Sequence, residues 1–225
     1  MHSRLSQADL VNDEYHSFYA YRHCKTENNQ AWSRINKCIS KFLLQLTSIV
    51  LVTLSSSAFS VIADDYSDRR ILAGTKLFRT LLAADQNIEA KTSPDNKLQL
   101  ALIYNNSQSA AGNVADVIQS RANSDIRNIP IKTKLLKVDE LASTTYLAGL
   151  FITQQLFDDE LQTVIRYAVD HHIVIYSPFE GDVEKGVLGG MSVEARVRPY
   201  LNIKTMHAAD LHLKPFFMKV SKQYD

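Results

Sequence analysis

The sequence predicts an α/β domain with a mostly parallel sheet that helices cover on both faces. Apolar runs alternate with amphipathic segments from residue 68 to residue 178. The runs are continuous rather than alternating, as in strands that are buried on both faces of a parallel sheet. With 45% hydrophobic and 22% charged residues, the composition is that of a globular protein. The formal net charge of +1 gives no strong field toward nucleic acid, so we expect none as a partner.

Each element follows from its hydrophobic period. Residues 68–88, 109–123 and 158–171 have the helical period, and Asp158-Asp159-Glu160 places negative charge at the start of the third helix. Strands are expected over 97–105, 129–138, 146–155 and 172–178, and Pro130 indicates an edge position or a strand start. The expected core residues of the central strands are Leu102, Ile103, Leu150, Phe151, Ile152, Val174 and Ile175.

The pattern changes after Pro178 to a polar, glycine-rich loop followed by period-two alternation. We expect two short antiparallel strands over 191–204 that are joined near Arg198-Pro199, or one strand that bends there. An amphipathic helix closes the chain within 205–222; it is expected to begin near Leu213, with Pro215 in its first turn.

Gly186, Gly189 and Gly190 precede the first of these strands. A phosphate-binding loop requires glycines between a strand and a helix, followed by Lys and Ser or Thr, and a dinucleotide site requires Gly-x-Gly-x-x-Gly opening a helix. Neither pattern is present. The glycines are therefore interpreted as backbone bends that lead into a strand.

Residues 37–63 have the layout of a secretory signal peptide. Lys37 and Lys41 precede the apolar run 42–54, and the segment ends in Val61-Ile62-Ala63. The run has 13 residues, short of the roughly 20 that span a bilayer. We expect cleavage after Ala63 or after Ala58 and a periplasmic location; an uncleaved membrane anchor is the alternative.

Residues 1–36 are polar, lack periodicity and form a disordered or mis-annotated extension in this interpretation. Both cysteines, Cys24 and Cys38, precede the cleavage point. The mature chain, 64–225, would then be a single domain without disulfides or a thiolate nucleophile.

The order of elements resembles the YfiR family of small periplasmic proteins. The most specific part is C-terminal: Gly189-Gly190-Met191 leads into a strand, the paired strand contains Tyr200-Leu201-Asn202-Ile203, and "ADLHLKP" with "FFMKV" follows (209–220). The likeness extends from about Ile71 to Val220 and rests on order, because no part of it is a catalytic motif.

The resemblance implies a Rossmann-like three-layer domain with C-terminal antiparallel strands and a terminal helix. It also implies a signalling regulator that binds an inner-membrane partner, a diguanylate cyclase or a histidine kinase, and so controls cyclic-di-GMP and biofilm formation. A homodimer is left open. Redox-responsive members of the family carry cysteines in the mature domain, whereas this chain has none there. We therefore do not expect this protein to respond to redox state through a thiol switch.

No residue pattern predicts an enzyme, a metal site or a cofactor site. His171-His172 suit a helix C-terminus better than a metal, and His207 and His212 are five residues apart rather than four. Ser177 lacks the Gly-x-Ser-x-Gly context of a nucleophile. We therefore expect a binding function without catalysis, cofactor or metal.

Ligand or partner contacts are expected beyond the carboxyl ends of the strands, where open parallel sheets bind ligands. Amide and aromatic side chains follow three of the expected strands and would face one cleft together with the 179–190 loop. The candidates are Tyr104, Asn105, Asn106, Thr153, Gln154, Gln155, Tyr176, Ser177, Phe179 and Glu180. The alternative to a regulator is a small-solute-binding protein of an envelope transport system.

Overall fold

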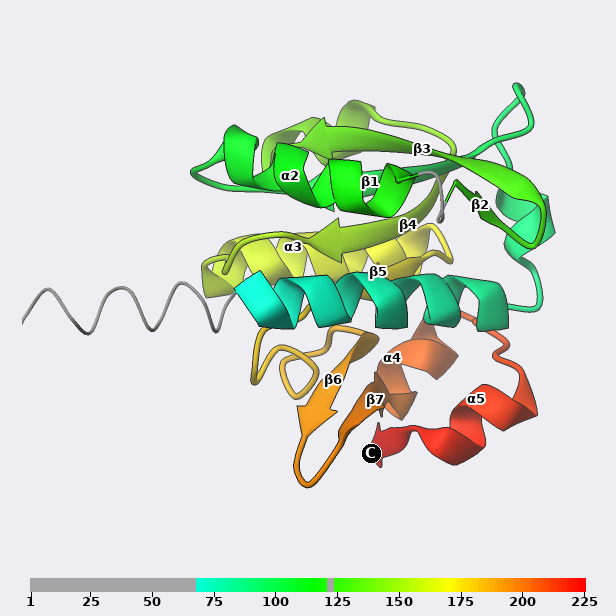
Figure 1. Cartoon of the computed structure of the whole chain (residues 1–225), viewed down its shortest axis with the longest axis vertical. Helices are drawn as coiled ribbons and strands as arrows, with labels where there is room; N and C mark the ends of the chain where they lie inside the picture. Colours follow the sequence, from blue (N-terminus) through cyan, green and yellow to red (C-terminus); the bar gives the residue numbers. More distant parts are fainter. Residues whose placement is uncertain (1–67, 121–123) are drawn as a thin grey trace, which may run out of the picture. The chain divides into compact units, whose positions relative to one another are not determined.

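An eight-stranded sheet with helices on both faces is the frame of the structure, a computed structural model that describes residues 68–120 and 124–225 (Figure 1). The strand order is β2-β3-β1-β4-β5-β6-β7-β8. A helix spans residues 68–84. It is followed by β1 (Leu98–Ile103), α2 (Gln108–Gln119), β2 (Asp125–Ile126), β3 (Ile129–Leu136), β4 (Leu147–Ile152), α3 (Asp158–Asp170), β5 (Val174–Tyr176), β6 (Gly189–Val193), β7 (Val197–Asn202), α4 (Ile203–Ala208), α5 (Pro215–Val220) and β8 (Lys222–Tyr224).

The predicted three-layer α/β fold is confirmed by the pairing of these strands. β3, β1, β4, β5 and β6 are parallel neighbours, whereas β2 and β7 each pair antiparallel with a neighbour. The helix 68–84 and α2 lie on the near face in Figure 1, and α3 lies behind the sheet. The chain moves outward from β1 to β3 and then in the opposite direction through β4 and β5, so right-handed crossovers place α2 and α3 on opposite faces.

The core forms where helix 68–84 crosses the central strands. Phe78 packs against Phe151 and Tyr176, with ring centroids 5.4 and 6.0 Å away, and the latter two rings stack at 5.6 Å. All three side chains are buried. The seven core residues predicted from the sequence are all fully buried as well, which confirms the assignment of the central strands.

The described residues, 68–120 and 124–225, belong to one compact unit. The predicted extension and signal peptide, together with both cysteines, lie outside the described residues. Within residues 68–120 and 124–225, no helix has the length and hydropathy needed to cross a membrane.

The predicted junction at Arg198-Pro199 is wrong. β6 and β7 form a hairpin whose turn lies at residues 194–196, and Val193 pairs with Val197. Pro199 therefore lies inside β7, opposite Met191. A proline is tolerated there because β8 pairs only with residues 200–202 of β7, so the edge beside Pro199 needs no backbone donor.

The single closing helix is also a wrong expectation. α4 and α5 are separate helices, and the extended residues between them pair with the end of helix 68–84: Gln86 N donates to His212 O at 2.9 Å, and Lys214 N donates to Ala84 O at 2.9 Å. Pro215 does occupy the first turn of α5, as expected. β8, which follows α5, was not predicted at all.

The glycines act partly as bends and partly as packing positions. Gly186 has φ +116°, a conformation that L residues rarely adopt, so it bends the chain before β6. Gly189 and Gly190 lie within β6, where a Cβ atom would come within 2.5 Å of Leu81 and Val183 respectively. They serve close packing, and they form no phosphate loop.

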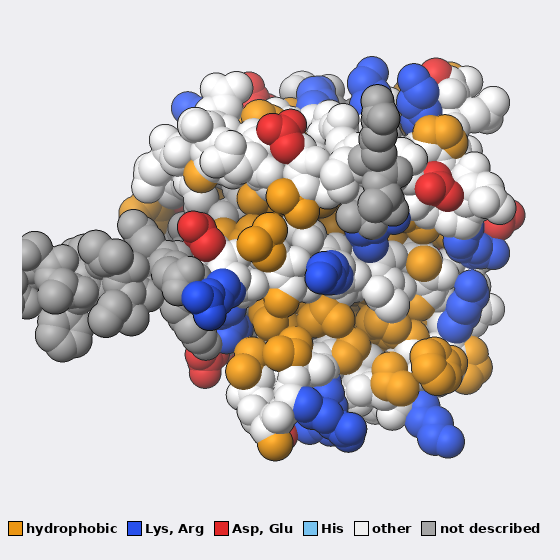
Figure 2. Space-filling model, in the orientation of Figure 1, with side chains coloured by type: hydrophobic (Ala, Val, Ile, Leu, Met, Phe, Trp, Pro, Cys, Tyr) orange, Lys and Arg blue, Asp and Glu red, His pale blue; other side chains and the backbone are white. Residues whose placement is uncertain are grey.

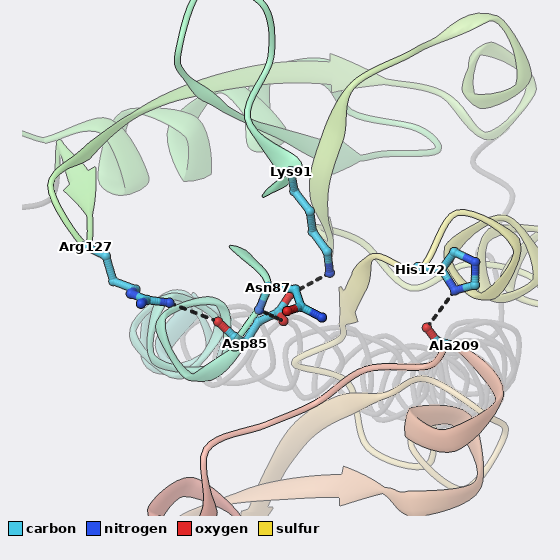
Figure 3. A network of polar contacts seen from close by, with 6 residues as sticks. All are labelled: Asp85, Asn87, Lys91, Arg127, His172 and Ala209. Carbon is cyan, nitrogen blue, oxygen red and sulfur yellow. Dashed lines mark hydrogen bonds and ion pairs between the residues drawn. The ribbon is translucent and has the colours of Figure 1, made fainter. Parts of the chain in front are cut away.

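A buried ion pair fixes the loop after helix 68–84 (Figure 3). The fully buried side chain of Asp85 accepts hydrogen bonds from Lys91 Nζ at 2.5 Å and from Asn87 N at 3.0 Å, and Arg127 donates to the Asp85 carbonyl at 3.3 Å. Since each Asp85 carboxylate oxygen has a donor, the desolvated carboxylate is compensated. This network is structural and joins segments far apart in the sequence.

Candidate functional site

The three predicted polar clusters follow β1, β4 and β5, which are adjacent and parallel, so they lie along one edge of the sheet. We call this the carboxyl edge. The chain reverses its direction of travel between β1 and β4, the point at which open α/β sheets form their ligand crevice. Ligand binding by the ten candidates stays a prediction. The structure shows where these residues lie and which of them are exposed.

Gln154 fills the crevice between β1 and β4. Its side-chain oxygen accepts hydrogen bonds from the backbone N–H groups of Asn106 and Ser107 at 2.9 and 3.0 Å, and its amide donates back to the Ser107 carbonyl. The neighbouring Asn105 donates to Glu160 on α3 at 3.0 Å. The two amides are therefore engaged within the protein, and they do not line the cavity described below.

Several other candidates are interior residues. Thr153 is buried and donates to the Ile103 carbonyl at 2.8 Å, and Tyr104 is 8% exposed. Tyr176 is buried in the aromatic core, and among the described residues its hydroxyl has no hydrogen-bond partner. Burial raises the pKa of Tyr176 well above its ordinary value. These three side chains are not available to a ligand at the surface, whereas Asn106 and Gln155 are exposed.

The segment after β5 is held by a buried polar contact. Ser177 Oγ donates to Asp182 Oδ2 at 2.5 Å and accepts from Phe179 N at 3.1 Å. Burial raises the pKa of Asp182, and the hydrogen bond from Ser177 opposes that rise. Asn202 Nδ2 donates to the Val183 carbonyl at 2.8 Å, and Thr205 Oγ1 donates to the Gly186 carbonyl at 2.8 Å. The loop from Phe179 to Gly186 is thus tied to β5, β7 and α4.

This loop is one wall of a cavity of about 220 Å³, which we call the carboxyl-edge cavity. The other walls come from the start of helix 68–84, from the β6–β7 hairpin and from β8. It is lined by Arg70, Phe179, Glu180, Gly181, Val183, Glu184, Met191, Ser192, Val193, Glu194, Tyr200 and Lys222. Of the ten predicted residues, only Phe179 and Glu180 reach it. The clusters after β1 and β4 therefore do not face this cavity: Gln154 bonds the backbone of Asn106 and Ser107, and Asn105 bonds Glu160.

Arg70 is the most enclosed cation of the cavity, with a side chain 10% exposed. Its Nε donates to the Pro178 carbonyl at 2.8 Å, and its Nη1 lies 4.0 Å from the exposed carboxylate of Glu180. These contacts hold the guanidinium in a fixed orientation at the cavity wall, where it places a permanent positive charge.

Carboxylates and a second cation line the opposite part of the cavity. Lys222 lies 3.1 Å from Glu194, and this contact lowers the pKa of the Glu194 carboxyl. Tyr200 is hydrogen-bonded to Glu184; burial first, and then this carboxylate, raises the pKa of Tyr200 to about 12. The cavity therefore presents groups of both charge signs beside the apolar side chains of Phe179, Val183 and Met191.

The histidine pair behaves as predicted for a helix end. His171 is the C-cap of α3, and its ring lies 2.8 Å from the Tyr167 carbonyl and stacks on the Tyr167 ring. His172 Nδ1 lies 3.0 Å from the Ala209 carbonyl (Figure 3). In the described part of the chain, no three His, Cys, Asp or Glu residues are grouped as metal ligands would be.

Sequence reasoning missed seven lining residues: Arg70, Met191, Ser192, Val193, Glu194, Tyr200 and Lys222. They come from a helix start, a hairpin and a strand that are separated by up to 152 residues along the chain. The alternation in the hairpin was visible, but the pairing of β8 with β7, which brings Lys222 to the cavity, had no sequence signal.

No family model and no curated protein matches the chain. Similar solved structures include the ligand-free, open structure of CD0873, a substrate binding protein with adhesive properties from Clostridium difficile, at 14% identity over 57% of this chain and 54% of that one (TM-score 0.45). An ABC domain in complex with L-Trp from Streptococcus pneumonia is 13% identical over 64% and 61% of the two chains (TM-score 0.43).

A conserved domain protein from Vibrio cholerae O1 biovar El Tor strain N16961 is 10% identical over 60% of this chain and 57% of that one (TM-score 0.41). The chain thus matches a little over half of the length of each of these structures. At these identities and TM-scores the similarities do not determine what this chain binds.

Proposed function

We propose that the domain is a binding module without catalytic activity that recognises a small polar solute in the carboxyl-edge cavity. The observation that carries the proposal is the enclosed Arg70 at one end of a cavity whose loop wall is fixed by hydrogen bonds. A site that is formed before the ligand arrives binds with a smaller entropic cost than one that must be ordered.

The size and charge of the cavity favour a class of solute. A volume of about 220 Å³ holds about seven water molecules at roughly 30 Å³ each, which is the space of a molecule the size of an amino acid. Arg70 would bind a carboxylate or another small anionic group of the solute, and Glu184 would attract a cationic group. A zwitterion of that size matches a cavity whose lining carries both Arg70 and the carboxylate of Glu184, whereas a simple anion would have no cationic group to pair with that carboxylate.

The test is thermal unfolding of the protein with alanine, with propionate, which lacks the ammonium group of alanine, and with ethylamine, which lacks its carboxylate. At one hundred times its dissociation constant, a bound solute stabilises the protein by about 2.7 kcal/mol. We expect alanine or a similar zwitterion to raise the melting temperature, and Arg70→Gln and Glu184→Gln to remove the shift. Lys132→Gln, on β3 and outside the cavity lining, is the matched control. Equal shifts in Arg70→Gln and in the control would overturn the proposal.

The regulatory role that the YfiR resemblance implies is a second candidate. It is supported by the C-terminal block, in which Gly189-Gly190-Met191 opens β6, and the paired strand β7 and the terminal helix α5 follow in the order of the resemblance. The described residues also form one α/β unit, so a solute would be recognised there without a second lobe closing over it.

Affinity purification of the tagged protein from envelope membranes tests this second candidate. Enrichment of a diguanylate cyclase or a histidine kinase, together with a change in cyclic-di-GMP on deletion of the gene, would support it. Enrichment of a permease and its ATPase instead would favour solute transport. Both candidates are expected in the periplasm, where fractionation would find the mature chain.

A further inference from the structure

A second hollow in the surface lies between the start of β7 and helix α5, outside the carboxyl-edge cavity. A groove of about 530 Å³, which we call the β7–α5 groove, is lined by Arg196 of the hairpin turn, by residues 197–199 of β7 and by Phe216, Lys219, Val220 and Ser221. No residue that lines the carboxyl-edge cavity lines this groove as well. The two are therefore separable by mutation.

The groove gathers exposed apolar side chains. Val197, Phe216 and Val220 are 51%, 77% and 41% exposed, and they are three of the seven large hydrophobic side chains that are exposed in the described residues. Phe216 and Val220 are four residues apart on α5 and so lie on one face of it, while Phe217 is buried in the core. Figure 2 shows hydrophobic side chains over α5 with Lys and Arg beside them. A grouping of this kind on a surface marks a contact site.

The charged residues that line the groove are all basic. Residues 195–222 contain six Lys or Arg and one acidic residue, Asp210, although the whole chain has nearly equal numbers of both. Arg196, Arg198 and Lys219 line the groove, and no Asp or Glu does. Arg198 is paired with Glu194 at 3.0 Å, whereas the side chains of Arg196 and Lys219 make no hydrogen bond or ion pair with any described residue. An occupant that fits must bring carboxylates.

The backbone at the groove also has unused hydrogen-bonding capacity. β8 pairs with Tyr200–Asn202 of β7 and stops there. Opposite β6, the edge of β7 over Val197 to Pro199 has no strand partner among the described residues. Since Pro199 has no N–H, this edge offers the N–H and carbonyl of Val197 and the carbonyl of Pro199. An extended peptide can add to such an edge through its main chain, and pockets beside it then select its side chains.

We propose that the β7–α5 groove binds an extended acidic segment of a protein partner, which pairs with the free edge of β7 and places a large apolar side chain against Phe216 and Val220. The carboxylates of the segment pair with Arg196 and Lys219. A lipid surface is less well matched, because the apolar side chains line a hollow that accepts an inserted side chain, and because a bilayer offers no backbone groups to the strand edge.

The probe is a fluorescein-labelled peptide, Asp-Glu-Val-Phe-Val-Asp-Glu, titrated with the protein and followed by anisotropy. We expect saturable binding that weakens as salt rises. The same peptide with Lys in place of its acidic residues, or with Ser in place of Phe, is expected to bind at least about tenfold more weakly. Phe216→Ser and Lys219→Glu are expected to weaken the acidic peptide by about five- to tenfold each.

Matched controls separate this site from others and from unfolding. Phe157→Ser removes an equally exposed aromatic residue at the start of α3, and Lys132→Glu reverses an exposed charge on β3. Neither should change peptide binding, and Arg70→Gln should leave it intact even where the solute response is lost. Circular dichroism melts show whether each variant is folded.

Three outcomes would overturn the proposal. The first is no saturable binding of the acidic peptide to the folded protein, and the second is equal binding of the acidic and basic peptides. The third is binding to vesicles of phosphatidylglycerol and phosphatidylethanolamine that Phe216→Ser and Lys219→Glu abolish while no peptide binds. That result would make the groove a lipid contact.

Discussion

Replacing Gly190 with alanine should destabilise the protein through the wall of the carboxyl-edge cavity. A Cβ atom at this position would lie 2.5 Å from Val183 Cγ2 and 3.1 Å from the Ser177 carbonyl oxygen. Ordinary contact begins near 3.4 Å, so Val183 would have to retreat by about 1 Å from a position in which it is 2% exposed. Overpacking of this kind costs about 1–3 kcal/mol, and we expect the free energy of unfolding to fall by that amount.

The control is a glycine with free space around it. Gly112 lies in α2, and a Cβ there would meet nothing within 4 Å. Gly112→Ala should therefore raise the free energy of unfolding by about 0.5–1 kcal/mol, because alanine loses less backbone entropy in a helix. The two changes add the same methyl group, so a loss at Gly190 beside a gain at Gly112 would show that the added Cβ is harmful only where neighbouring atoms already fill the space.

A second substitution tests the named contact. Val183→Ala alone should cost about 2 kcal/mol through lost burial and the resulting cavity. Combined with Gly190→Ala, the total should be smaller than the sum of the two by about 1 kcal/mol, because the small side chain at residue 183 makes room for the new Cβ.

Urea unfolding followed by circular dichroism measures all four variants, with the slope m compared to confirm a common unfolded state. A Gly190→Ala protein within about 0.5 kcal/mol of the parent would refute the packing argument. So would strict additivity of the two substitutions.

Three further outcomes are expected. Phe151→Ala should cost about 3–5 kcal/mol in urea unfolding, because its buried ring packs against two others, whereas the exposed Phe157→Ala should cost under about 0.5 kcal/mol. Since burial raises the pKa of Asp182, its carboxyl group stays protonated to a higher pH in the folded state than in the unfolded state. Relative to Asp182→Asn, the parent should lose stability as pH rises from 3.8 through the raised pKa; a pH-independent difference between the two would contradict this. Mass spectrometry of the periplasmic fraction should find a chain that begins after Ala63 or Ala58, and an intact N-terminus would reject cleavage.

The sequence by itself determined the central sheet. Continuous apolar runs such as 97–105 and 146–155 can be buried on both faces only in a covered parallel sheet, and hydrophobic period distinguishes them from the helices between them. The alignment of three polar strand ends along one edge followed from the same reasoning, because parallel neighbours end on the same side. These features depend on local pattern, which the chain carries within windows of about ten to twenty residues.

Only the tertiary structure decided which of those strand ends faces a cavity. Gln154 closes the crevice between β1 and β4 by bonding backbone groups 47 and 48 residues away, and nothing in its local sequence distinguishes it from a ligand-binding amide. Arg70 and Lys222 meet in one cavity because β8 adds to β7 after a break in the closing helix. That break arises where residues 212–214 find backbone partners at the end of helix 68–84. These backbone partners come together only when distant segments fold against each other, so the hydrophobic period of the sequence does not predict them.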